Sequence, residues 1–214
     1  MCGVAFHIRE NLERVRRNIR AAALRSNRSP DSVRVVAVTK AVGIEEIRTL
    51  YALGIREFGE NRLADAEKKI VALGSGDITW HMVGTLQTRK VRDAVKYFHR
   101  IDSVDRISIA EEIEKQAARQ QKLVRVLLEV NVSGEASKHG FSPQQLPEII
   151  ERTKAMPHIL VEGLMTMAPF VSDPEQTRPC FAALRELAAQ FGVAELSMGM
   201  SNDYKIAIKA GSNM

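Results

Sequence analysis

The first candidate for chemistry is the amine of Lys40, which stands directly after an apolar run. Residues 35–39 read Val-Val-Ala-Val-Thr, the pattern of a buried strand, and Lys40 follows them. Desolvation at a strand end favours a neutral amine, which can attack a carbonyl and form a Schiff base. A lysine in this place can also extend past the strand into water. Residues at the ends of the other strands decide between these two interpretations.

Two polar residues follow the second apolar run, where a partner of Lys40 is expected. Phe58 and Gly59 lead into Glu60 and Asn61. The amide of Asn61 is suited to hydrogen-bond a ring hydroxyl, and the carboxylate of Glu60 is suited to hold a neighbouring amine. The alternative is a helix cap followed by ordinary acidic residues of a first turn.

A glycine-containing turn near the end of the chain is a candidate phosphate site. Residues 197–203 read Ser-Met-Gly-Met-Ser-Asn-Asp and open a helical pattern over 202–210. The backbone N–H groups of Gly199, Met200 and Ser201, the Ser201 hydroxyl and the positive end of the helix suit a phosphate. Simple capping of the helix by Ser201 is the alternative.

Two further residues lie within apolar runs. His81 alternates with apolar neighbours, which predicts that it fills the interior of the sheet or forms hydrogen bonds within the core. Met165, in the run 163–169, offers a thioether that can pack against a flat ring, with core filling as the alternative. Cys2 and Cys180 are the only cysteines. They are too few for a disulfide framework or a spaced zinc site, so we expect no metal.

The apolar runs alternate with helical patterns along the whole chain. The predicted strands are 33–39, 55–59, 79–84, 98–103, 123–132, 159–167 and 194–198. Helix-start patterns occur at Ser142-Pro143-Gln144-Gln145 and at Asp173-Pro174-Glu175-Gln176, and Gly192 is placed to end a helix. Serial βα units predict a parallel sheet, either open or closed as a (β/α)8 barrel, with functional residues at the carboxyl ends of the strands.

Length and composition favour one globular domain. The chain has 214 residues, 45% of them apolar and 27% charged, and no run is long enough to span a bilayer. We expect a single domain over 1–214 and an intracellular protein, since arginines stand where a signal peptide would be apolar. Seven strands leave a parallel barrel one strand short, so we expect an eighth strand after Met214.

The charge distribution raises the question of nucleic-acid binding. The net charge is +5, and seven arginines lie between Arg9 and Arg28. Val4, Ile8, Leu12, Val15 and Ile19 follow helical spacing in the same segment, and neither a reading motif nor a series of stacking aromatic residues accompanies the arginines. We interpret the segment as an amphipathic helix with a solvated basic face, and we expect no nucleic-acid partner.

Five motifs in this order resemble one known family. They are Val38-Thr39-Lys40, Phe58-Gly59-Glu60-Asn61, Trp80-His81 with Gly84 and Leu86-Gln87, Gly163-Leu164-Met165-Thr166-Met167-Ala168-Pro169, and Leu196-Ser197-Met198-Gly199-Met200-Ser201. Together they resemble the YggS/PROSC family of pyridoxal phosphate homeostasis proteins across nearly the whole chain. The resemblance implies a TIM (β/α)8 barrel of the alanine-racemase N-terminal type with an extra N-terminal helix. It also implies pyridoxal 5'-phosphate (PLP) bound to Lys40 as an aldimine, with its phosphate at the Ser201 turn.

This resemblance leads to a cofactor-binding set and a function. The expected PLP-binding residues are Lys40, Asn61, Met165, Gly199, Met200 and Ser201. We expect a cytoplasmic carrier that holds PLP without turnover, delivers it to apo PLP-dependent enzymes, and is a monomer or a weak dimer. The alternative is a PLP-dependent amino-acid racemase or another Schiff-base enzyme on the same barrel. Catalytic residues are expected only under that alternative.

Overall fold

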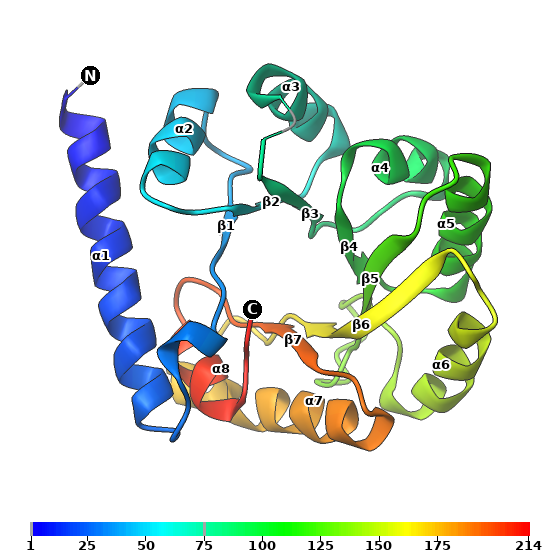
Figure 1. Ribbon diagram of the computed structural model, residues 1–214. Coiled ribbons are helices and arrows are strands. Elements are labelled where there is room, and N and C mark those ends of the chain that lie inside the picture. The colour runs from blue at the N-terminus through cyan, green and yellow to red at the C-terminus, as the bar shows by residue number, and fades with distance from the viewer. Residues whose placement is uncertain (1, 75) are drawn as a thin grey trace.

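Seven parallel strands form one curved sheet, a partial barrel, with helices around its outside (Figure 1). The computed structural model describes residues 2–74 and 76–214. The strands are β1 (Val36–Val38), β2 (Glu57–Glu60), β3 (Thr79–Met82), β4 (Arg100–Val104), β5 (Val124–Glu129), β6 (Ile159–Thr166) and β7 (Glu195–Met198). The helices are α1 (Cys2–Leu24), α2 (Ile44–Ala52), α3 (Leu63–Leu73), α4 (Val91–Tyr97), α5 (Ile107–Arg119), α6 (Leu146–Lys154), α7 (Arg178–Phe191) and α8 (Tyr204–Ala210).

The strands neighbour one another in chain order, as expected for serial βα units. Each of the seven predicted apolar runs overlaps one of these strands, and β2 and β4 each end one residue later than predicted. Two predicted helix starts are also present, although each opens with a 3-10 turn: Gln145 Oε1 accepts from Ser142 N at 2.9 Å before α6, and Asp173 Oδ1 accepts from Glu175 N at 3.0 Å before α7. Gly192 ends α7 with a positive φ of 68°, a conformation that favours glycine.

The two edge strands, β1 and β7, face each other across a seam that contains the last residues of the chain (Figure 1). Leu196 N donates to Asn213 Oδ1 at 2.8 Å, and Ser212 Oγ donates to Met198 O at 2.8 Å. Arg34 N, just before β1, donates to Asn213 O at 3.0 Å. Residues 212–214 therefore connect β7 to the segment that leads into β1. That a further strand follows Met214 stays a prediction.

The outer face of the sheet is apolar and packs against the helices. Phe58 and Trp80 are paired in register on β2 and β3, are almost completely buried, and have ring centroids 5.7 Å apart. Ile101 and Val126 continue this layer on β4 and β5, and both are fully buried. Each large apolar side chain buried in this way contributes about 1.5–3 kcal/mol of transfer free energy. This layer holds the strands in place and fixes where their carboxyl ends lie.

Helix α1 packs along one side of the barrel, beside α2 and α8. Ile19, Ala22 and Ala23 form a small buried cluster with Ile208 of α8, and Leu12 joins the main core. The predicted amphipathic helix is confirmed, with its apolar stripe on the protein and its arginines on the other faces. Within residues 2–74 and 76–214, none of the helices combines the length and apolar character needed to cross a membrane.

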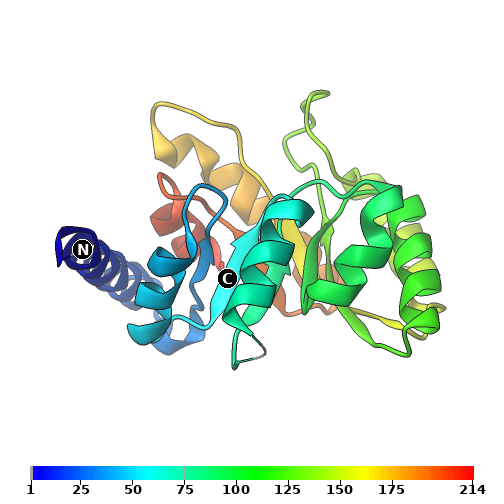
Figure 2. The same ribbon diagram turned by 90° about the horizontal axis from the view of Figure 1, so that it is seen from above.

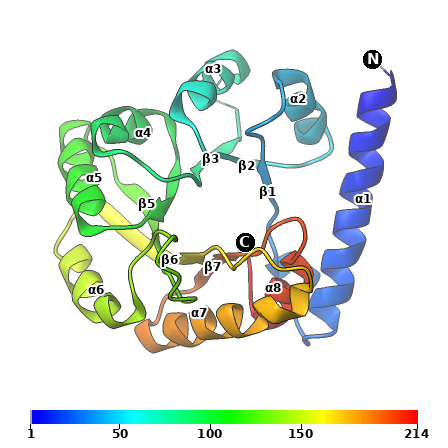
Figure 3. The ribbon, with the colours of Figure 1, turned by 180° about the vertical axis from the view of Figure 1, so that it is seen from behind.

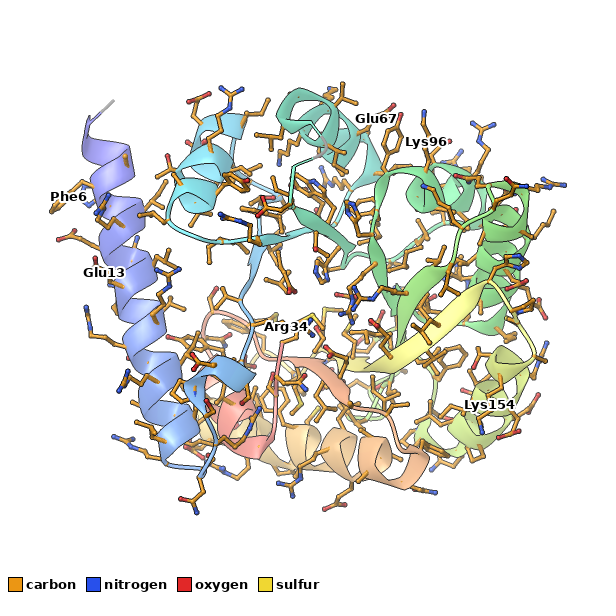
Figure 4. All side chains as sticks on the ribbon, viewed as in Figure 1. Phe6, Glu13, Arg34, Glu67, Lys96 and Lys154 are labelled. Carbon is orange, nitrogen blue, oxygen red and sulfur yellow. The ribbon has the colours of Figure 1, made fainter. Side chains whose placement is uncertain are left out.

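The inner face of the barrel is ionic rather than apolar. Arg100 on β4 is 1% exposed and lies 3.3 Å from Glu162 Oε2, 3.5 Å from Asp102 Oδ1 and 3.7 Å from Glu195 Oε2. Arg34, which is labelled in Figure 4, lies on the segment before β1. It joins this network by pairing with Glu195. Buried charges of this kind are tolerated where they are paired.

His81 lies within the same network, which confirms the prediction that it occupies the interior. Its Nδ1 is 2.8 Å from Asp102 Oδ2 and its Nε2 is 3.2 Å from Glu57 Oε2. Burial lowers the pKa of His81, but the hydrogen bonds and charges of Asp102 and Glu57 outweigh burial and raise this pKa above its usual value. Asp102 and Glu57 therefore favour the protonated form of His81.

Candidate functional site

Lys40 lies at the carboxyl end of β1, where the sequence analysis places it, but its side chain is exposed. Val38, two residues earlier, is 51% exposed, so the end of this strand is open to solvent. Of the two interpretations of Lys40, the structure therefore favours the one in which the side chain extends past the strand into water. In the part of the chain that the structure describes, no hydrogen bond or ion pair engages the Lys40 amine. The amine is thus accessible to a ligand at this end of the barrel.

Three buried polar groups hold the backbone that leads into Lys40. Lys69 Nζ on α3 donates to the Thr39 carbonyl at 2.7 Å and to Glu60 Oε1 at 2.7 Å. Thr39 Oγ1 donates to the same carboxylate oxygen at 2.6 Å. Thr39 and Glu60 are 1% and 0% exposed, and we call Thr39, Glu60 and Lys69 the Lys69 triad. Because the Thr39 carbonyl belongs to the peptide bond before Lys40, the Lys69 triad fixes the base of the exposed lysine.

The expected role of Glu60 is confirmed with a different amine. Glu60 holds the ammonium of Lys69, nine positions later in the sequence, and leaves the amine of Lys40 unpaired. Sequence reasoning missed Lys69 because a lysine in an amphipathic helix ordinarily faces solvent. The sequence signal that could have found Lys69 is Glu60 itself. A glutamate that ends a buried strand requires a nearby cation or a proton.

Asn61 follows β2, the strand that neighbours β1, and is held by a close backbone approach. A Cβ atom on Gly84 would lie 2.4 Å from the Asn61 carbonyl oxygen and 2.7 Å from its Cα. Gly84 is therefore required for the β3 connection to pass over Asn61. The Asn61 side-chain amide forms no hydrogen bond among the described residues, so it is free to bind a ligand.

Met165 lies on β6 and pairs in register with Glu129 of β5 and Ser197 of β7. Its side chain is only 5% exposed, and its carbonyl accepts from Val130 N at 2.8 Å. Because nearly all of its surface is buried, the structure favours the interpretation that Met165 fills the core. Met165 also brings the end of β6 next to the strand that carries the candidate phosphate turn.

The turn between β7 and α8 is tight and leaves backbone donors free. Gly199 has a φ of 97°, and a Cβ atom there would lie 2.6 Å from Ala207 Cβ, so only glycine fits. Met200 N donates to the Asp203 carboxylate, which takes this N–H out of the expected phosphate site. Within the described residues, the N–H groups of Gly199, Ser201 and Asn202 have no acceptor. These three donors and the exposed Ser201 can bind an anion.

The predicted site residues fall into two groups at one end of the barrel. Lys40 and Asn61 follow the adjacent strands β1 and β2, whereas Met165 and the 199–201 turn belong to the adjacent strands β6 and β7. The seam between β1 and β7 separates the groups (Figure 3). The β1–α2 and β7–α8 connections rise on the same face of the molecule (Figure 2). Among the described residues, no cluster of His, Cys, Asp and Glu could hold a metal ion.

A buried pair of carboxyl groups at the same end was not predicted. Glu129 ends β5 and is 2% exposed, and Asp105 follows β4 and is 6% exposed. Arg106 Nη1 lies 2.7 Å from Asp105 Oδ1, and His139 Nδ1 lies 3.5 Å from Asp105 Oδ2. Burial and the nearby charge of Asp105 raise the pKa of Glu129 to about 7. The available signal was a glutamate between Leu128 and Val130, inside a predicted strand.

Comparison with known proteins identifies the family. Residues 11–214 match the model of the alanine racemase, N-terminal domain, family. A pyridoxal phosphate homeostasis protein from Aquifex aeolicus (strain VF5) is 40% identical over 211 residues, which cover 96% of this chain and 92% of that protein. The chain belongs to the pyridoxal phosphate homeostasis protein family. The resemblance drawn from five ordered motifs is thereby confirmed.

Two solved structures are similar to this family member in fold. PipY of Synechococcus elongatus PCC7942, in a structure with PLP bound, is 34% identical, has a TM-score of 0.81, and is matched over 92% of this chain and 94% of PipY. An alanine racemase of Clostridium difficile 630 is 16% identical with a TM-score of 0.71, over 94% of this chain and 51% of the racemase. The likeness to the racemase shows a shared fold. The match covers about half of the racemase chain.

In this family member, Glu129→Gln is expected to remove part of the pH dependence of stability. The folded pKa of about 7 lies above the unfolded value of 4.5. The stabilisation from the protonated carboxyl is therefore complete below pH 4.5 and is lost as the pH rises through about 7. The variant is expected to match the parent near pH 4.5 and to be more stable at pH 8, by on the order of 3 kcal/mol.

Urea unfolding at a series of pH values measures this difference. Glu148→Gln, at a carboxylate that is 72% exposed on α6, is the control and is expected to follow the parent at every pH. If the free energy of unfolding of Glu129→Gln changed with pH between 4.5 and 8 in the same way as that of the parent, the raised pKa of Glu129 would be contradicted.

Proposed function

We propose that this chain binds PLP, with the Lys40 amine joined to the aldehyde as a Schiff base and the 199–202 turn binding the phosphate. PLP supplies an electrophilic aldehyde and a dianionic phosphate when bound. The observation that supports the proposal best is that two groups suited to bind PLP lie at one end of the barrel. Among the described residues, these are an exposed lysine amine with no hydrogen-bond or ion-pair partner and a turn with three N–H donors that have no acceptor.

The residues around Lys40 fit this ligand. The Lys69 triad holds the peptide bond before Lys40, which limits how far the amine can move. Glu60 is neutralised by Lys69, so it does not compete for the Lys40 ammonium. Asn61 offers a free amide to a ring hydroxyl, and Met165 contributes an apolar wall from β6. These side chains bind and orient the ring, and the reaction with the aldehyde requires only the Lys40 amine.

The turn fits a phosphate, with one change to the predicted set. Gly199 and Ser201 remain proposed donors, and Asn202 N joins them because its N–H is also free. Met200 N is occupied by Asp203, so Met200 contributes the shape of the turn rather than a donor. The Asp203 carboxylate is 1% exposed and lies within the turn, which keeps its charge away from the surface where the phosphate would bind.

We propose that the chain holds PLP for homeostasis and does not convert a substrate. A carrier needs an accessible amine and a moderate phosphate grip, because very tight retention would prevent exchange. The same proposal includes a single domain over 1–214, action in the cytoplasm as a monomer or weak dimer, and delivery of PLP to apo-enzymes. A racemase is the competing function, since the fold is shared with alanine racemase. An assay of alanine racemisation with added PLP is expected to give no rate that depends on Lys40.

Ser201→Asp is expected to weaken PLP binding about tenfold or more and to leave pyridoxal binding unchanged. The introduced carboxylate would repel the phosphate and compete for the free N–H groups of the turn. Pyridoxal keeps the aldehyde and the ring but has no phosphate, so it reports on the Lys40 side alone. Absorbance titrations with both compounds measure the ratio of the two affinities. Equal losses for PLP and pyridoxal would contradict a phosphate site at this turn.

A further inference from the structure

A basic hollow lies at the opposite end of the barrel from Lys40. It has a volume of about 590 Å³ and is lined by residues of α1 and of the segments that lead into β1 and β2. Figure 1 shows α1 beside the segment that leads into β1. Five arginines line it: Arg16, Arg17, Arg20, Arg34 and Arg56. Lys40 and Asn61 follow the carboxyl ends of β1 and β2, whereas this hollow borders their amino ends. The proposed PLP site therefore makes no use of it.

The charges around the hollow are unbalanced. Arg34 pairs with Glu57 and Glu195, and Arg56 pairs with Asp77 at 2.7 Å. The three arginines of α1 form no ion pair with any residue in the described part of the chain; they are Arg16, Arg17 and Arg20. Arginines three and four positions apart on one helix repel each other. Asp31 also lines the hollow, so the three arginines of α1 together with this carboxylate leave a surplus of about two positive charges on one concave surface.

Two of the guanidinium groups are already held in place. Arg16 Nη2 reaches from α1 to the residue that follows α2 and donates to Leu53 O at 2.8 Å. Arg56 Nη1 donates to Tyr51 O at 2.7 Å, and its guanidinium lies 4.1 Å from the centroid of the Tyr51 ring. Groups fixed in this way lose little freedom when a ligand binds. Arg17 and Arg20 remain free to complete the contact.

The lining also includes an apolar floor. Ile19 and Ile55 are 8% and 5% exposed, and Val33 and Val35, on the segment before β1, line the hollow with them. Guanidinium groups match the geometry of phosphate oxygens, and an apolar floor suits the organic part of a ligand. Cavities of about 300–1,000 Å³ are typical of small-molecule sites. We propose that this hollow binds a phosphorylated organic small molecule with at least two negative charges.

Calorimetric titration with ADP, inorganic pyrophosphate and adenosine tests the proposal. ADP is expected to bind saturably at one site, pyrophosphate more weakly, and adenosine not at all. The double variant Arg17→Gln/Arg20→Gln is expected to weaken ADP binding about tenfold or more, because each change removes a charge-assisted contact. PLP absorbance and the thermal midpoint are expected to stay unchanged in this variant, which separates the hollow from the proposed PLP site.

Arg9→Gln/Arg25→Gln is the matched control. It removes the same charge from exposed positions of α1 and the turn after it, outside the hollow, and is expected to keep the affinity of the parent for ADP. An equal loss in both double variants would overturn the proposal in favour of a general charge effect. Absence of saturable binding by ADP and pyrophosphate would also overturn it. Displacement of ADP by a short single-stranded oligonucleotide at far lower concentration would reassign the surface to nucleic acid.

Discussion

In Lys40→Ala, the absorbance band that PLP forms with the protein is expected to disappear, and the affinity for PLP to fall on the order of a hundredfold. Lys40 is exposed and unpaired among the described residues, so its removal is expected to leave the free energy of unfolding unchanged. The residual binding is expected to come from the 199–202 turn and to depend on the phosphate. Absorbance titration and urea unfolding measure the two effects separately.

Lys205→Ala is the control for this prediction. Lys205 is an exposed lysine that lies close in sequence to the turn, but it belongs to α8 and not to the turn itself. Its removal is expected to leave both the band and the affinity unchanged. Retention of the full band in Lys40→Ala, or its loss in Lys205→Ala, would contradict the assignment of the amine.

Lys69→Met is expected to lower the free energy of unfolding by about 3–5 kcal/mol, because it leaves a buried carboxylate without its cation. Glu60 is 0% exposed, and its second oxygen has no hydrogen-bond partner in the described structure. Loss of the ammonium also frees the Thr39 carbonyl, so capture of PLP by Lys40 is expected to slow. Urea unfolding gives the first effect, and stopped-flow absorbance after mixing with PLP gives the second.

Two companion variants separate charge from position. Lys68→Met changes the exposed neighbour on α3 and is expected to stay within about 0.5 kcal/mol of the parent. Glu60→Gln/Lys69→Met removes both charges and is expected to regain most of the stability, while PLP capture stays slow because Thr39 O still lacks its donor. If the double variant regained the capture rate as well, the Lys69 triad would have no positioning role.

The repeat of strands and helices was predictable because it depends on local patterns. The run before Lys40 and the run that contains Met165 each form a strand, and the basic N-terminal segment forms an amphipathic helix. Gly192 ends α7 because a positive φ suits glycine, a property of a single residue. The same local patterns place Lys40 and Ser201 after strands. In a parallel barrel, this is enough to put both residues at one end.

Contacts between distant segments were not predictable in the same way. The ionic inner face depends on Arg100 meeting Glu162 and Glu195 from strands far apart in the sequence. The exposure of Lys40 follows from the open edge at β1, which its own apolar run does not reveal. The raised pKa of Glu129 requires burial beside Asp105, a residue that follows another strand. Each of these properties depends on the arrangement of the strands.

A crystal structure of the protein grown with PLP tests the central proposal most directly. The account predicts continuous electron density from Lys40 Nζ to the ring, with phosphate oxygens within hydrogen-bond distance of the backbone nitrogens of Ser201 and Asn202. Density joined to another lysine, or a phosphate bound away from the β7–α8 turn, would contradict it.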